Sequence, residues 1–415
     1  MRKYDTDFDR ASLAYLHAIG HRVVCYSGSG YRPGRYMLNS LTLNSIIFAF
    51  LCYALLCFIL NSLYFRRRAG RFSFSDSERV SILLRVSNEE ANLSTCIDSL
   101  LAQTYTNKEI VILDDHSSDS SWNIIQSYAL TFAPRVRALR SKPLPDGWHD
   151  KNWACHQLSK RATGEWLLFT DAGTIHEPDS VLNAYRESKA RGLSLASYLP
   201  GLITQTLSEK VVLPVIYISF YLLFPLALLK RMRNHHAAFA FGSFLFVNRS
   251  TYDRIGGHVS RPDEFVNDIN LARQVKKAGE NFDMLDGTRM IYSRFYRNFG
   301  EIWRGFSRSA LGAFGYSIVT YLAVILLAYS VFLDPVIKLA IFQDLSLHSH
   351  HLRQVLFLLG LRLTLAIKTR HSLLSVIFHP VAIGFSLLFA LNSLAKVLRG
   401  FPIPWKGRAL NTTKQ

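Results

Sequence analysis

The uncharged stretch from Leu41 to Phe65 restricts the fold of this chain more than any other segment. A helix over this stretch, at about 1.5 Å per residue, is long enough to cross the roughly 30 Å hydrocarbon core of a bilayer. Four basic residues follow at once: Arg66, Arg67, Arg68 and Arg71. The positive-inside rule then places the next domain in the cytosol. We therefore predict a transmembrane helix over residues 41–65, with a buried core helix as the alternative.

The residues in front of this helix, 1–40, contain no apolar run of the kind that a cleaved signal peptide requires. The segment from Tyr26 to Gly34 is rich in Gly and Ser and has the composition of a linker. We expect residues 1–40 to form an N-terminal extension, and we assign it no function.

The composition also points to a membrane, because 49% of the residues are hydrophobic and only 19% are charged. A net charge of +18 could attract nucleic acid, phosphorylated substrates or an anionic membrane surface. The basic residues flank apolar runs at 66–68, 230–233 and 368–370, which favours the membrane and argues against nucleic acid as a partner. The five scattered cysteines lack zinc-like spacing and predict reduced thiols.

The segment from about Val80 to Ala310 alternates short apolar runs with amphipathic stretches, as an α/β domain does. Strands are expected at 80–86, 109–113, 136–139, 166–169 and 242–247, and helices at 121–130, 151–162 and 264–278. Two of these strands end in acids, namely Asp114 with Asp115, and Asp171. Ligands of open α/β sheets bind at the carboxyl ends of the strands, so these acids predict a ligand site.

Each candidate has a purely structural alternative. Asp171 alone could equally cap the next helix, and Asp268, near the start of the expected helix 264–278, could serve only the helix dipole. The basic, aromatic-rich segment 289–308 could clamp a diphosphate or could extend its side chains to the membrane surface. We expect the membrane surface for most of its arginines, which are Arg289, Arg294, Arg297, Arg304 and Arg308.

The apolar stretch 211–229 is long enough to span a bilayer, but Pro214 and Pro225 interrupt it. A single crossing would also place the two halves of the α/β domain on opposite sides of the membrane. We therefore predict an element that lies in the membrane interface.

The C-terminal region is expected to be embedded in the membrane over residues 311–397, with spans at 309–333 and 372–395. His379-Pro380 would kink the second span. The stretch 354–367 contains Arg362 and could be a third span or an interfacial helix. A basic tail over 398–415 ends the chain, and the number of spans decides on which side it lies.

Several motifs in order resemble a membrane-attached family 2 glycosyltransferase with a GT-A (Rossmann-like) fold. These motifs are Ser87-Asn88-Glu89-Glu90, Leu113-Asp114-Asp115, Gly147-Trp148 with Lys151-Asn152-Trp153-Ala154, Phe169-Thr170-Asp171-Ala172, Ile255-Gly256-Gly257-His258, Asp268, His379-Pro380 and Trp405-Lys406-Gly407-Arg408. Within the family, the chain is most similar to the branch of the carotenoid-acid (diaponeurosporenoate) glucosyltransferases and the hopanoid-associated glycosyltransferases. The resemblance covers about residues 41–410 and implies a cytosolic domain over 72–310 between transmembrane helices.

The resemblance implies a role for each matching residue. Glu89 and Asp115 would contact the uridine of a nucleotide-sugar donor, and Lys151 would lie near its diphosphate. Asp171 would be the first acid of the D-x-D motif and would reach the ribose or a divalent cation, Mg²⁺ or Mn²⁺. Asp268 would be the general base of an inverting transfer of a hexose, from a UDP-sugar to a lipid or terpenoid acceptor in the membrane.

Two positions depart from the family pattern. Gly173 stands where the second metal-binding acid of the D-x-D motif belongs, and Asn267 replaces the acid in front of Asp268. His176 is not expected to replace the missing ligand. Two alternatives follow, a processive polysaccharide synthase of the same superfamily and a degenerate membrane protein that binds nucleotide without catalysis. The first lacks support because no Gln-x-x-Arg-Trp motif follows Asp268.

Overall fold

The computed structural model describes residues 33–66, 78–232, 234–264, 266–313, 317–399, 403–405 and 408–410. Most of the predicted N-terminal extension, most of the predicted basic tail, and Arg67, Arg68 and Arg71 lie outside the described residues. The chain divides into two compact units, residues 1–46 and 47–415, and helix α2 (Pro33–Arg66) runs from the first into the second.

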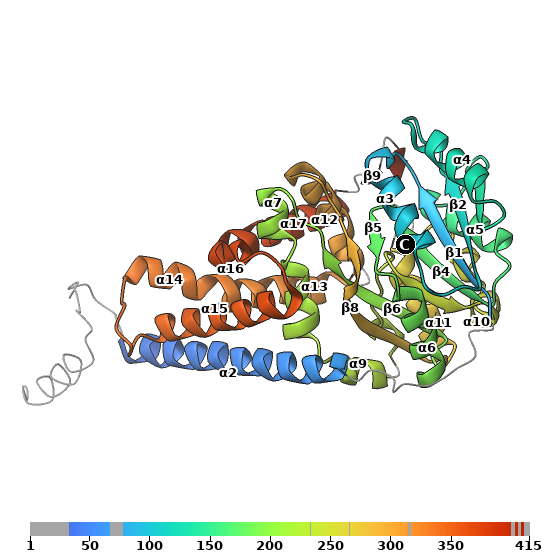
Figure 1. Ribbon diagram of the computed structural model, residues 1–415. Helices are drawn as coiled ribbons and strands as arrows, with labels where there is room; N and C mark the ends of the chain where they lie inside the picture. The colour runs from blue at the N-terminus through green and yellow to red at the C-terminus, as the bar shows by residue number, and fades with distance from the viewer. Residues whose placement is uncertain are drawn as a thin grey trace, which may run out of the picture. The chain divides into compact units, whose positions relative to one another are not determined.

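The second unit is built on an eight-stranded mixed sheet in the order β3-β2-β1-β4-β7-β6-β8-β5 (Figure 1). The first four strands in this order are parallel, and β7 and β5 run against their neighbours. The strands are β1 (Val80–Val86), β2 (Lys108–Asp114), β3 (Val136–Arg140), β4 (Trp166–Asp171), β5 (Thr174–His176), β6 (Leu195–Leu202), β7 (Leu245–Asn248) and β8 (Phe282–Ser293).

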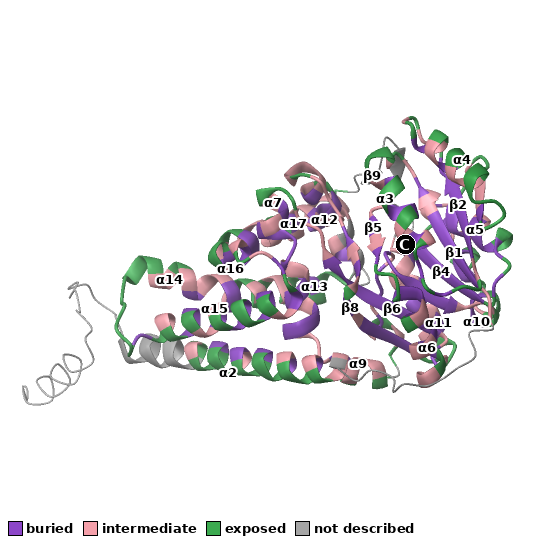
Figure 2. Cartoon of the chain, in the orientation of Figure 1, coloured by how far each residue is buried: buried purple, intermediate pink, exposed green. Residues whose placement is uncertain are grey.

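Both faces of the sheet are covered, and most residues of β1, β2, β4 and β6 are buried (Figure 2). In β1, Ile82 and Leu84 face one layer of the core and Leu83 faces the other. The first layer contains α3 (Glu90–Leu101), α4 (Ser121–Thr131) and α6 (Ser180–Arg191). The second contains α5 (Asp150–Arg161), α10 (Arg249–Arg254) and α11 (Asn267–Lys277).

The expected strands at 80–86, 109–113, 136–139 and 166–169 are confirmed, as are the helices at 121–130, 151–162 and 264–278, within a few residues. The strand expected at 242–247 begins only at Leu245. Strands β6 and β8 were not predicted. Pro200 and Gly201 interrupt the apolar pattern of β6, and charged residues interrupt that of β8.

The end of β4 leads directly to the far edge of the sheet. Only two residues separate β4 from β5, which pairs with β8 at the edge of the sheet. At this junction the backbone N–H of Arg294 donates to the carbonyl of Gly173 at 3.0 Å. The sheet therefore curls, and the segment after β8 lies beside the end of β4.

The stretch 211–229 does not form one long helix. It is divided into α7 (Leu207–Val212), α8 (Val215–Ile218), the π-helical turn η1 (Ser219–Leu223) and α9 (Leu226–Arg231), with breaks at Pro214 and Pro225. Several of its apolar side chains, including Tyr217 and Tyr221, are buried against the protein itself. Its contact with the membrane interface stays a prediction.

The C-terminal region is helical. It contains α12 (Phe299–Ala313), α13 (Ile318–Ala328), η4 (Tyr329–Leu333), α14 (Asp334–Phe342), α15 (His350–Thr369), α16 (Leu374–Ile377) and α17 (His379–Leu398). Short elements complete the fold: the 3₁₀ turns η2 (His235–Ala237) and η3 (Gly257–Val259), and an antiparallel pair, β9 (Ile403–Trp405) and β10 (Arg408–Leu410).

Three helices of the described chain are long and apolar enough to cross a membrane, at Leu43–Phe65, Ile318–Phe342 and His379–Leu398. The span expected at 309–333 was misplaced, because α12 ends at Ala313 and the apolar helix starts at Ile318. The helix expected over 372–395 is interrupted where His379-Pro380 was expected to kink it, because α16 ends at Ile377 and α17 begins at His379. Pro380 lies in the first turn of α17, where its missing N–H and fixed φ are favourable.

Candidate active site

A cleft at the carboxyl edge of the parallel strands brings together the strongest candidates. Asp171 comes from the end of β4, Lys151 from the first turn of α5, and Asp268 from the first turn of α11. The cleft is lined by Leu83, Arg85, Lys151, Cys155, Phe169, Thr170, Asp171, Gly242, Leu245, His258, Asn267 and Asp268.

Lys151 lies between the two acids of the cleft. Its Nζ is 3.2 Å from Asp171 Oδ1, and the Lys151 side chain is 24% exposed. Burial lowers the pKa of Lys151, but the carboxylates of Asp171 and Asp268 raise it by more, so its pKa lies above the ordinary value for lysine. The ammonium group therefore keeps its charge throughout the neutral range.

Asp268 is held by the backbone around it. Its Oδ2 accepts a hydrogen bond from the N–H of Gly242 at 2.8 Å, and its Oδ1 accepts one from the N–H of Ile269 at 3.1 Å. A Cβ at residue 242 would lie 2.8 Å from Lys151 Nζ and 3.0 Å from Asp268 Oδ2. Glycine at this position therefore lets the backbone approach both charged groups.

Two other ionisable residues of the cleft are unsuited to acid–base or covalent chemistry. Burial lowers the pKa of His258 to about 3, and its Nδ1 lies 2.7 Å from the hydroxyl of Tyr252. Burial raises the pKa of the Cys155 thiol to about 12, so this thiol is neutral and a poor nucleophile. The carboxylates of Asp171 and Asp268 are therefore the groups of the cleft that can accept a proton.

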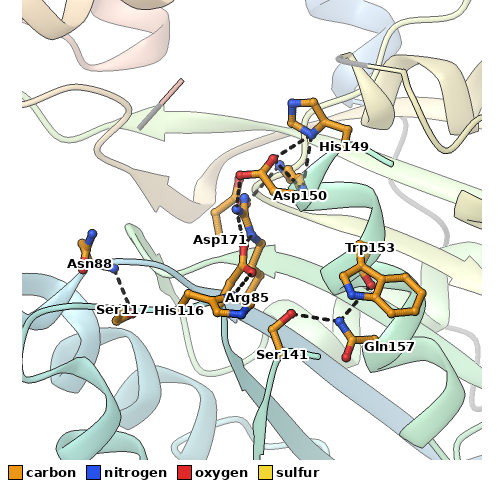
Figure 3. A network of polar contacts seen from close by, with 12 residues as sticks. Arg85, Asn88, His116, Ser117, Ser141, His149, Asp150, Trp153, Gln157 and Asp171 are labelled. Carbon is orange, nitrogen blue, oxygen red and sulfur yellow. Dashed lines mark hydrogen bonds and ion pairs between the residues drawn. The ribbon is translucent and has the colours of Figure 1, made fainter. Parts of the chain in front are cut away.

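A buried ionic network supports the same edge of the sheet. Arg85 bonds Asp115 Oδ2 through Nε at 2.9 Å and through Nη2 at 2.5 Å, and its Nη2 is also 2.8 Å from Asp150 Oδ2. Figure 3 shows Arg85 pointing toward Asp150, with His149 Nδ1 on the other oxygen of that carboxylate at 2.8 Å. The network holds the side chain of Asp150, the residue that precedes Lys151 in the sequence, in place.

The stability that Asp150 contributes should depend on pH. Burial raises the pKa of Asp150, but His149 and Arg85 lower it by more, so it lies well below the ordinary value. A depressed pKa stabilises the fold fully above the ordinary aspartate pKa of about 4, and this stabilisation is lost as the pH falls further. We expect Asp150→Asn to lower the free energy of unfolding by about 3 kcal/mol at pH 7.

Thermal unfolding between pH 7 and pH 3 measures this effect. The gap in unfolding midpoint between wild type and Asp150→Asn should narrow toward pH 3, while the exposed Asp146→Asn control should match wild type throughout. A gap that stays constant with pH would contradict the assignment.

Two arginines of the segment 289–308 lie in ion pairs of the protein. Arg297 Nη2 is 2.9 Å from Glu89 Oε2, and Arg294 Nη2 is 3.0 Å from Glu209 Oε1. The expectation that most arginines of this segment extend to a membrane surface is therefore wrong for these two. Glu89 does not line the cleft, and Asp115 reaches it only through Arg85.

The expected metal site offers few ligands. Across the described ranges of the chain, no three His, Cys, Asp or Glu side chains converge as a metal-binding cluster. His176 is buried in the core, where its Nε2 lies 3.0 Å from Thr170 Oγ1. Asp171, whose side chain is 45% exposed, is accessible. Its carboxylate suits Mg²⁺ or Mn²⁺, because a protein can hold such an ion with one carboxylate while phosphates and water supply the other ligands.

Arg85 and Asp150 were missed by the sequence reasoning. One signal could have found Arg85, which is the only charged residue in the apolar strand β1. A buried guanidinium requires acidic partners, and the chain after β2 supplies Asp115. Asp150 carried no comparable signal, because an acid in the first turn of a helix is common.

The strands and helices form a Rossmann-like domain with this cleft at the carboxyl edge of the sheet. Residues 81–256 match the family model Glycosyl transferase family 2. The matched stretch is thus similar to family 2 glycosyltransferases, and it contains β2, β4, all but the first residue of β1, and the candidates Glu89, Asp115, Lys151 and Asp171. Asp268 lies beyond the matched residues.

Two curated relatives illustrate the similarity. The chain is 44% identical over 95 residues to the UDP-Glc:alpha-D-GlcNAc-diphosphoundecaprenol beta-1,3-glucosyltransferase WfaP of Escherichia coli, covering 23% of this chain and 35% of that protein. It is 33% identical over 113 residues to the poly(ribitol-phosphate) beta-glucosyltransferase of Bacillus spizizenii, covering 27% of this chain and 17% of the relative. The matches thus span about a third or less of these relatives.

A solved structure shows the same fold over a longer range. The mannosyltransferase PcManGT from Pyrobaculum calidifontis, in complex with GDP-Man and Mn²⁺, matches with a TM-score of 0.52 at 15% identity. The match covers 86% of this chain and 99% of that chain. The α/β domain is therefore GT-A-like, with a curled mixed sheet.

Proposed function

We propose that this protein is an inverting glycosyltransferase that moves a hexose from a nucleotide sugar to a lipid or terpenoid acceptor in the membrane. We propose a UDP-sugar as the donor. One observation carries the proposal. Asp171, Lys151 and Asp268 converge in one cleft at the carboxyl edge of a family 2 domain. This cleft pairs a cationic group for the leaving diphosphate with a carboxylate for the acceptor.

On the donor side, the bond between the anomeric carbon and the diphosphate oxygen breaks, and negative charge grows on that oxygen. The Lys151 ammonium is positioned to offset this charge. Asp171 would hold a divalent cation, which supplies further positive charge to the diphosphate when bound. Glu89, held by Arg297, and Asp115, held by Arg85, are our candidates for the uridine contacts.

On the acceptor side, Asp268 accepts the proton of the attacking hydroxyl while the new bond forms on the opposite face of the sugar ring. The Gly242 N–H fixes the carboxylate through Oδ2. One displacement inverts the anomeric configuration, and the products are the glycosylated acceptor and the nucleoside diphosphate.

The membrane acceptor is supported by the apolar helices. Three helices are long and apolar enough to span, and they would let the acceptor stay in lipid while the donor arrives from water. WfaP acts on a diphosphoundecaprenol-linked sugar. We also propose that the acceptor is a terpenoid, as in the carotenoid-acid and hopanoid branch. The protein would then be an integral membrane protein whose catalytic domain faces the cytosol.

Donor screening tests the proposal. We would measure UDP release by the full chain in detergent with each UDP-sugar, with total membrane lipid as acceptor and with Mg²⁺, Mn²⁺ or EDTA. The expected result is release that depends on one donor and on added lipid. No release with any donor would reject a transferase and leave the non-catalytic alternative. A polymeric product would favour the processive synthase.

The missing second acid at residue 173 leads to a separate prediction. We expect Gly173→Asp to raise the apparent affinity for Mn²⁺ about tenfold in UDP release, because a second carboxylate would join Asp171. Wild type should keep measurable turnover in EDTA, because Lys151 still supplies positive charge.

Gly173→Ala is the matched control for this substitution. A Cβ at residue 173 would lie 3.2 Å from the Arg294 carbonyl oxygen, a contact that both variants share. Only the carboxylate distinguishes them. An equal change in Mn²⁺ dependence in both variants would refute the prediction.

A further inference from the structure

Each acid that we propose for the donor side has a cation beside it. The pairs are Asp115 with Arg85, Asp171 with Lys151, and Glu89 with Arg297. The first two cations lie within residues 81–256, the stretch that matches the family model. Arg297 lies outside that stretch, 208 residues after Glu89 in the chain. One cation of the site therefore comes from a different part of the protein.

Arg297 lies in the segment 294–298, which joins β8 to α12. This segment passes the end of β4, because the N–H of Arg294 donates to the carbonyl of Gly173 at 3.0 Å. Glu89 caps the start of α3, directly after β1. The Arg297 guanidinium thus joins the segment after β8 to the carboxyl edge of the parallel strands, with Nη2 2.9 Å from Glu89 Oε2.

Glu89 lies in the neighbourhood of Asp171 and can be reached from solvent. Burial raises the pKa of the Cys96 thiol, and the negative charges of Asp171 and Glu89 raise it further. Cys96 Sγ lies 3.9 Å from the carbonyl oxygen of Asp171. The side chain of Glu89 is 28% exposed and that of Arg297 is 38% exposed. A ligand from solvent can therefore touch this ion pair without any rearrangement of the core.

The position of Arg297 is set by the helical region. Its backbone N–H donates to Glu301 Oε2 at 2.8 Å, which fixes Arg297 to the first turn of α12. Helix α12 packs on α17 through aromatic rings, and the ring centroids of Phe299 and Phe385 are 4.9 Å apart. Helix α17 is one of the three helices that are long and apolar enough to cross a membrane. Arg297 therefore connects these helices to Glu89.

We infer that Arg297 is a positioning residue of the donor site, which orients Glu89 and neutralises its charge for the incoming nucleotide. The donor diphosphate is an anion, so a carboxylate without a cation beside it would repel the donor. An ion pair between partly exposed groups contributes little to folding, so its loss should affect mainly ligand binding. The inference rests on the proposed function in taking Glu89 as a donor contact. It makes the helical region part of donor binding.

UDP binding to the full chain in detergent, in the presence of Mn²⁺, tests the inference. Arg297→Gln should weaken UDP binding about tenfold, because Glu89 loses the cation beside it. Arg297→Lys keeps the charge and should recover part of the affinity. Arg304→Gln, which removes an exposed arginine of α12, is the matched control and should bind UDP as wild type does.

A double-mutant cycle shows whether Arg297 acts through Glu89. In the Glu89→Gln background there is no carboxylate to neutralise, so Arg297→Gln should have little further effect on UDP affinity. A loss of the same size in both backgrounds would show that Arg297 contacts the donor itself. That result would overturn the positioning role.

Turnover separates positioning from damage to the fold. Arg297→Gln should raise the KM for the donor by a factor similar to the loss in UDP affinity, and kcat should stay close to that of wild type. A fall in kcat with unchanged KM would indicate loss of folded enzyme and would overturn the role. UDP affinity that Arg297→Gln leaves unchanged would reject the inference alone. Absence of UDP binding in wild type would reject the proposed donor, and the role of Arg297 with it.

Discussion

Asp268→Asn should lower the rate of glycosyl transfer by about 10²–10⁴-fold, because the amide cannot take the proton of the acceptor hydroxyl. The asparagine keeps an oxygen that can accept from the Gly242 N–H, so the unfolding midpoint and the donor affinity should stay close to those of wild type. Product formation from the donor found by screening, measured at saturating donor, gives the rate. The loss should fall on kcat.

Asp263→Asn is the matched control, because Asp263 is exposed and lies five residues earlier, in the loop before α11. It should transfer sugar at the rate of wild type. An Asp268→Asn variant that is folded and fully active would remove Asp268 as the base. Such a result would also favour an acceptor that attacks through a carboxylate, because a carboxylate has no proton to lose.

Lys151→Met should lower kcat by about 10²–10³-fold, because it removes the cationic group beside the leaving diphosphate. It also leaves Asp171 and Asp268 in one cleft without the ammonium that offsets their charge. UDP release at saturating Mn²⁺ measures the effect. We expect the variant to depend fully on the added cation, whereas wild type keeps part of its activity in EDTA.

Lys160→Met, at the exposed end of the same helix, is the control for the loss of one lysine. It should behave as wild type does. Lys151→Arg keeps the charge and should retain more activity than Lys151→Met. Equal turnover of Lys151→Met and wild type in EDTA would show that Lys151 does not act on the leaving group.

The parallel half of the sheet and its acids could be predicted from the sequence. Strands β1, β2 and β4 are short apolar runs bounded by polar residues, and this pattern is local. Asp171 follows such a run directly, so its place at the carboxyl edge required no knowledge of distant contacts. Lys151 and Asp268 were assigned through the resemblance, and the structure brings both to Asp171.

The other half of the sheet could not be predicted in this way. Strand β8 carries Asp283, Asp286 and Arg289 among its apolar residues, and two of these charges are satisfied by partners far away in the chain. Lys230 pairs with Asp283, and Lys368 pairs with Asp286. Propensity and periodicity describe only neighbours in sequence, so they do not detect a strand that distant partners stabilise.

The sequence by itself determined an α/β domain with acids at the carboxyl ends of its strands and apolar helices on either side, because these features follow from periodicity, length and charge within single segments. Only the tertiary structure decided that Lys151 stands between Asp171 and Asp268, that Arg297 meets Glu89, and that Arg294 meets Glu209. The physical reason is that charges pair across space. Which pairs form depends on how the sheet curls and where each helix starts.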